Sequence, residues 1–190
     1  MALLVSALLA AACAERRPGS VADPQAPPAE ESPPPEHAGE LPGASCRNVN
    51  AGNPANFPDF VDVELESEDG VDRVTFVFEP SPDAPDRPPF HFVSFVDELI
   101  TDGEGARVEV EGRAYVLVSF QAMGVDLSSE TPVEVYTGPK RFTPEYGTLK
   151  ELVHLGDFEG QVSWGLGLAS KECFLLEAEA DRLTLEFPSA

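Results

Sequence analysis

From Asp59 onward the chain consists of short segments in which apolar and polar residues alternate, and turn-forming residues separate one segment from the next. Segments such as "FVDVELES", "DRVTFVFE", "FHFVSFVDEL", "RAYVLVSF" and "QVSWGLGL" recur about every 8–12 residues, a spacing that is typical of all-β sandwiches and barrels. Alternation with a period of two gives each strand one buried and one exposed face. The sequence therefore predicts an all-β fold, a β-sandwich of about ten short strands.

The clearest hairpin is predicted where "FVDVELES" and "DRVTFVFE" are joined by the turn-forming "EDG". A second tight turn is expected at "TDGEG", residues 101–105. One short helix is expected at "PEYGTLKELV", residues 144–153, where the spacing of apolar residues is compatible with a helix. The residues of the first hairpin that are predicted to face inward are Val61, Val63, Leu65, Val74, Phe76 and Phe78.

Trp164 is the single tryptophan of the chain, and it lies beside two glycines in "QVSWGLGL". Strand alternation places Trp164 on the apolar face and both Gly165 and Gly167 on the opposite face, where glycine allows a bend or the close approach of another backbone. Two interpretations stay open, a buried core residue and a platform on which a sugar stacks. If Trp164 belongs to the core, a ligand is expected on the glycine-bearing face, so these three residues form a candidate binding surface.

The N-terminal segment "MALLVSALLAAAC" is too short to span a bilayer but has the apolar run and small residues of a secretory signal. Its end, "LLAAAC", resembles the lipobox of bacterial lipoproteins, and that resemblance implies that Cys13 is lipidated and anchors the mature protein. We therefore expect a signal peptide over residues 1–13 and a protein attached to the outer face of the cell membrane through lipid alone. The alternative is an ordinary cleaved signal and a secreted protein.

Residues 14–45 are rich in proline and glutamate and show neither a helical nor a strand period. Such a segment buries too little apolar surface to offset the entropy of ordering, which predicts an extended, disordered linker before a folded domain at residues 46–190. Outside the cytoplasm, the two remaining cysteines, Cys46 and Cys173, are expected to form a disulfide; two buried free thiols are the alternative.

The formal net charge of −22 excludes some classes of partner. A surface this acidic repels phosphate backbones and anionic headgroups, so we expect no nucleic acid partner. A solvated acidic surface explains this charge, and binding of a divalent or otherwise cationic ligand is the alternative.

Motifs of catalytic and metal sites are absent from the sequence. The histidines at 37, 91 and 154 lie near no G-x-S-x-G elbow, and neither H-E-x-x-H, a P-loop nor G-x-G-x-x-G occurs. His91 and His154 lie in apolar strands, where a buried histidine that satisfies its hydrogen bonds is the expected state. We therefore expect no enzyme activity, no cofactor and no metal site.

Several segments resemble the AMIN-like domain of actinobacterial secreted and lipid-anchored proteins: "GVDRVTFVFE", "VYTGPKRF", "VHLGDFEGQVSWGLGL" and "CFLLEAEADRLTLEF". The resemblance covers most of residues 55–188. It implies a β-sandwich that binds peptidoglycan or localises a partner in the cell envelope. The leading hypothesis is a non-catalytic envelope lipoprotein that binds cell-wall glycan or an envelope protein. The alternatives are a purely structural protein–protein interaction module and a hydrolase that uses scattered carboxylates.

Overall fold

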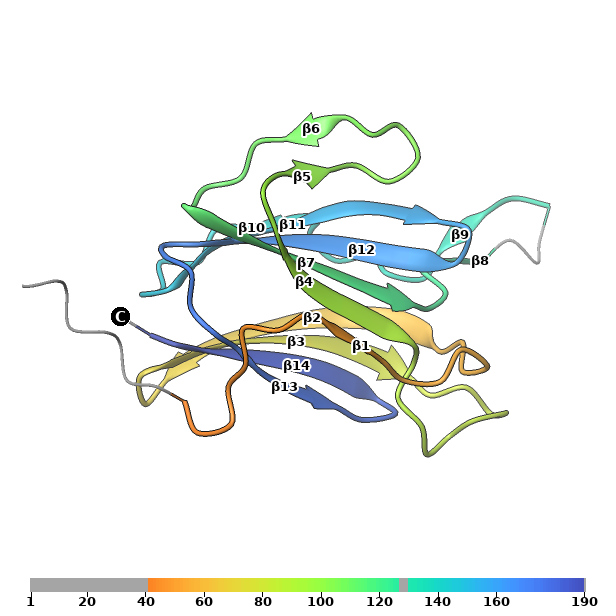
Figure 1. The fold of residues 1–190 in the computed structure, drawn as a ribbon. Coiled ribbons are helices and arrows are strands. Elements are labelled where there is room, and N and C mark those ends of the chain that lie inside the picture. Colours follow the sequence, from red (N-terminus) through yellow and green to blue (C-terminus); the bar gives the residue numbers. More distant parts are fainter. Residues whose placement is uncertain (1–40, 127–129, 190) are drawn as a thin grey trace, which may run out of the picture. The chain divides into compact units, whose positions relative to one another are not determined.

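The computed structural model describes residues 41–126 and 130–189, and these residues form strands and loops with no helix among them. Figure 1 shows two larger sheets stacked as layers. Cys13, the signal peptide and most of the linker lie outside the described residues, and the boundaries given above for these segments stay predictions. None of the described residues belongs to a helix long and apolar enough to cross a membrane.

The larger sheet has six antiparallel strands in the order β1-β4-β7-β12-β11-β10. Its two central strands, β7 and β12, are paired along their whole length. The strands of this sheet are β1 (Val49–Ala51), β4 (His91–Val96), β7 (Ala114–Gln121), β12 (Gln161–Leu168), β11 (Leu149–Phe158) and β10 (Arg141–Phe142).

The smaller sheet has four antiparallel strands in the order β13-β14-β3-β2 and lies below the first in Figure 1. Its strands are β13 (Leu175–Ala178), β14 (Arg182–Pro188), β3 (Val71–Glu79) and β2 (Asp59–Glu68). Two small ribbons complete the fold, β5 (Leu99–Ile100) with β6 (Arg107–Val108) and β8 (Val125–Asp126) with β9 (Val133–Glu134). The prediction of an all-β sandwich is confirmed.

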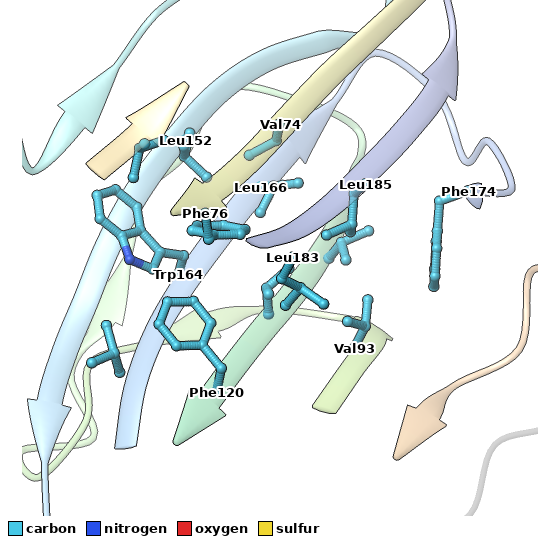
Figure 2. Packing of buried hydrophobic residues seen from close by; sticks show 14 of the residues in the cluster. Val74, Phe76, Val93, Phe120, Leu152, Trp164, Leu166, Phe174, Leu183 and Leu185 are labelled. Carbon is cyan, nitrogen blue, oxygen red and sulfur yellow. The ribbon is translucent and has the colours of Figure 1, made fainter. Parts of the chain in front are cut away.

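Inward-facing side chains of both sheets form the core, and Figure 2 shows them directed toward one another. On β3, alternation buries Val74, Phe76 and Phe78 as predicted, because every second residue of a strand faces the same side. The predicted β2–β3 hairpin forms, with Asp69 (φ 53°) and Gly70 (φ 77°) in the turn. The predicted turn at residues 101–105 also forms, between β5 and β6.

Two expectations fail at β-bulges. The register of β2 shifts between Phe60 and Asp62, so Phe60 and Val63 both face inward and Val61, predicted to be buried, is 38% exposed. The predicted helix at residues 144–153 is wrong, because β11 begins at Leu149 and pairs with β12. A register shift between Leu149 and Glu151 leaves both Leu149 and Leu152 buried. These two leucines are three positions apart, which is also the spacing of a helix face.

Candidate functional site

The outer face of the four-stranded sheet carries a groove of about 650 Å³, which we call the arginine–glutamate groove. All four strands of this sheet or their turns contribute to it. It is lined by Glu64, Leu65, Glu66, Arg73, Thr75, Glu177, Glu179, Arg182, Thr184 and Glu186.

Strand register places these side chains in rows across the sheet. One row runs Glu66, Arg73, Glu186, so that a cation on β3 lies directly between two carboxylates of the neighbouring strands. In the next row Thr75 of β3 and Thr184 of β14 are direct partners. Their hydroxyl oxygens lie 3.1 Å apart and both residues are buried, so they form the floor of the groove.

Both arginines of the groove are held by acidic partners. Arg73 donates to Glu66 and, through Nε at 2.7 Å, to Glu186, and the hydrogen bond to Glu186 raises the pKa of this guanidinium above its ordinary value. Arg182 lies 3.0 Å from Asp181 and 3.5 Å from Glu179, and the hydrogen bond to Asp181 raises its pKa in the same way. The groove therefore presents guanidinium donors and carboxylate acceptors side by side, in fixed positions.

The sequence analysis missed this groove, although a signal for it is present. The segments "DRVT" and "DRLT", residues 72–75 and 181–184, share the pattern D-R-x-T. Because β3 and β14 are antiparallel, the two segments meet at their threonines. A pair of such segments on adjacent strands predicts two arginines and two hydroxyls on the same outer face.

A buried carboxylate ties the two sheets together behind this groove. Asp72 accepts hydrogen bonds from the backbone N–H groups of Thr148 (2.7 Å) and Leu149 (2.9 Å) and from the hydroxyl of Ser67 (2.7 Å). Burial alone would raise the pKa of Asp72, but these hydrogen bonds outweigh it and hold the pKa below its ordinary value. The sequence analysis did not single out Asp72, even though alternation places it on the inward face with Val74.

The predicted disulfide is present. Cys46 and Cys173 are bonded across a sequence separation of 127 residues, with their Cα atoms 4.5 Å apart. Beside it, the N–H of Ser45 donates to the carbonyl oxygen of Phe174 at 2.8 Å. The disulfide thus joins the start of the domain to the loop that leads into β13.

Trp164 is completely buried, as strand alternation predicts for a core residue. Its ring centroid lies 5.7 Å from that of Tyr136, 6.0 Å from Phe76 and 6.1 Å from Phe60, so aromatic rings of the four-stranded sheet and of the loop after β9 surround the indole. Figure 2 shows the indole beside the ring of Phe76. No face of the indole is open for a sugar to stack on.

Gly165 and Gly167 are also buried, because the β5–β6 ribbon and the loop after it cover the outer face of β12. A Cβ on Gly165 would lie 2.6 Å from Leu99, and one on Gly167 would overlap the carbonyl oxygen of Glu111. The close approach of the Glu111 backbone is thus the reason for glycine at 167, whereas the side chain of Leu99 fills the space beside Gly165. The candidate binding surface at these glycines is corrected accordingly, because the chain itself occupies the space expected for a ligand.

The covering segment is held in place by Glu151. This buried carboxylate accepts hydrogen bonds from the guanidinium of Arg141 and from the backbone N–H of Glu111. Leu99 and Val110 of this segment pack with Val153 of β11 and other residues in a second, smaller apolar cluster. The outer face of the six-stranded sheet is therefore partly a second core.

Both described histidines have structural surroundings. Nδ1 of His91 lies 2.9 Å from the carbonyl oxygen of Pro89, and burial lowers the pKa of His91. The ring centroid of His154 lies 5.0 Å from that of Trp164, and burial, with a smaller contribution from Lys140, lowers its pKa. Across residues 41–126 and 130–189, no group of three or more His, Cys, Asp or Glu side chains is placed to bind a metal ion.

Comparison with known proteins supports the resemblance seen in the sequence. No curated protein and no solved structure matches the chain. The AMIN-like domain family matches residues 58–187, which span every strand of the four-stranded sheet and all but β1 of the six-stranded sheet. AMIN-like domains are in general binding modules that engage components of the cell wall or envelope. The chain therefore belongs to the AMIN-like domain family.

Proposed function

We propose that this protein is a non-catalytic envelope protein whose AMIN-like domain holds cell-wall glycan in the arginine–glutamate groove. The observation that carries the proposal is the lining of the groove, in which arginines, glutamates and threonine hydroxyls alternate across four strands. A glycan offers hydroxyl and amide groups that both donate and accept hydrogen bonds. Such a ligand can use both kinds of partner at once.

The charges of the groove favour a neutral glycan over a polyanion. Five glutamates face two arginines in its lining, and each arginine already has two acidic partners. A phosphate-rich polymer would have to displace these carboxylates in a chain with a formal net charge of −22. Neutral saccharide segments meet no such repulsion.

We expect the groove variant Arg182→Gln to sediment with purified peptidoglycan sacculi about five- to tenfold less well than the wild-type chain, because hydrogen bonds from a charged donor are lost. Arg107→Gln is the matched control, because Arg107 is likewise exposed and paired with two carboxylates, those of Glu98 and Glu109, but lies on β6 outside the groove. The bound fraction, measured by quantitative sedimentation at low and moderate salt, should not change in this control.

Equal sedimentation of both variants and the wild type would show that the groove does not bind the glycan. A wild-type chain that stays in the supernatant would remove glycan binding altogether. That second result would favour docking of an envelope protein, for which the structure offers an apolar cleft of about 390 Å³ between the edge strands β1 and β13, lined by Val49, Phe174, Leu176 and others.

We further propose that the domain is exported and held at the membrane by a lipid on Cys13, on the strength of the sequence "LLAAAC". Stable attachment then comes from more than one acyl chain, since each buried CH₂ contributes about 0.8 kcal/mol. In cells expressing the gene from its natural start, the wild-type protein should partition into detergent and incorporate a palmitate analogue, and Cys13→Ser should do neither. Equal labelling of the two proteins would contradict the anchor.

A further inference from the structure

Another pocket, of about 330 Å³, lies where the end of β4 meets the start of β7. Phe95 and Asp97 line it from the β4 side, Arg113 and Tyr115 from the β7 side, and Lys171 from the loop between β12 and β13. None of these residues lines the groove, and they belong to the other sheet or its loops. The sequence analysis gave no role to any of them.

Within the described part of the chain, no ion pair neutralises the two cations of this pocket. Arg113 and Lys171 form no ion pair with any described carboxylate. In a chain with a formal net charge of −22, two such side chains in one pocket form a local positive site. By contrast, five other cationic side chains form ion pairs with carboxylates: Arg73, Arg107, Lys140, Arg141 and Arg182.

The backbone segments that carry both cations are anchored. Lys171 is two residues before Cys173, whose disulfide ties down this loop, and its Nζ lies 4.8 Å from the ring centroid of Phe95. The backbone N–H of Arg113 donates to the carbonyl oxygen of Leu168 at 2.7 Å, where β12 ends. The two charged groups therefore come from neighbouring, anchored loops instead of free chain ends.

We propose that this pocket binds an organic carboxylate of monosaccharide or dipeptide size. A guanidinium offers two parallel N–H groups that fit the two oxygens of a carboxylate, and the ammonium of Lys171 adds a second charge-assisted hydrogen bond. The volume is at the small end of ligand pockets. Asp97 leaves the lining with one net positive charge, which suits a monoanion better than a phosphate dianion.

The test is a titration of the full chain at low salt, by calorimetry or ligand-observed NMR, with three probes. N-Acetylmuramic acid carries a lactyl carboxylate, and N-acetylglucosamine is the same sugar without it. N-Acetyl-D-alanyl-D-alanine supplies the carboxylate from a peptide end. We expect the two carboxylates to bind, N-acetylglucosamine not to bind, and the double variant Arg113→Gln/Lys171→Met to lose at least about tenfold in affinity.

Arg87→Gln is the control for net charge, because Arg87 is an exposed arginine with no described ion pair that lies outside the pocket. Its affinity should equal that of the wild type. Preferential binding of the sugar acid or of the dipeptide would identify the source of the carboxylate. The proposal is overturned if neither carboxylate binds, if N-acetylglucosamine binds equally well, or if the double variant keeps its affinity. Binding of sacculi through the groove is measured separately with Arg182→Gln, so either proposal can fail alone.

Discussion

Replacing Trp164 by alanine is expected to lower the free energy of unfolding by about 3–5 kcal/mol, since the largest completely buried side chain is removed from the centre of the core. The rings of Phe60, Phe76 and Tyr136 that surround it come from β2, β3 and the loop after β9, and they cannot all move into the space. Chemical denaturation, followed by far-ultraviolet circular dichroism because the variant lacks the tryptophan signal, measures the loss.

Trp164→Phe is the matched control and should cost much less. It keeps an aromatic ring in the cluster, and it removes the indole Nε1, which is buried without a hydrogen-bond partner among the described residues. In the wild type, the fluorescence should be blue-shifted, weakly quenched by acrylamide and unchanged by cell-wall fragments. A folded Trp164→Ala variant of wild-type stability, or emission that responds to muropeptides, would contradict the core role.

Removing the disulfide with Cys46→Ser/Cys173→Ser is expected to lower the free energy of unfolding by about 4–5 kcal/mol. Its loop of 127 residues restricts the unfolded chain strongly in the chain-entropy treatment of cross-links. Denaturation curves of the wild type with and without reductant should reproduce this loss, and those of the double variant should not depend on reductant.

Cys13→Ser is the control for the loss of a cysteine as such, because it leaves the Cys46–Cys173 bond intact. Its unfolding curve should match the wild type. Mass spectrometry of the non-reduced protein supplies an independent measure. Two thiols that alkylate freely without reductant, or a double variant as stable as the wild type, would contradict the expected role of the bond.

Period-two alternation was enough to predict the fold class, because a strand with one buried face requires that pattern. It failed where the chain departs from regular pairing. The extra residue at Val61 reverses the alternation of β2, and the shift after Leu149 gives β11 the apolar spacing of a helix. A bulge depends on how the partner strand packs, and a single strand sequence does not contain that information.

The candidate sites were harder to predict than the fold, since each depends on contacts between distant segments. Gly167 correctly indicated the approach of another backbone, whereas Gly165 faces the side chain of Leu99. The pattern did not reveal that residues 99–111 of the same chain fill this space. Thr75 and Thr184 lie 109 positions apart, so their meeting follows from strand order alone. Arg113 and Lys171 likewise line the same pocket only because the loop from β12 to β13 passes from one sheet to the other beside the start of β7.

The place of β14 bears on when the chain can fold. β14 follows all the other strands in sequence, yet it lies between β13 and β3 in the four-stranded sheet. A growing chain that ends at Ala178 has the β2–β3 hairpin but not the strand that pairs beside it, and contacts so distant in sequence form slowly. A ribosome must therefore complete almost the entire domain before its sandwich can close. Such a delay fits the proposed export, in which an unfolded chain would thread through a membrane channel.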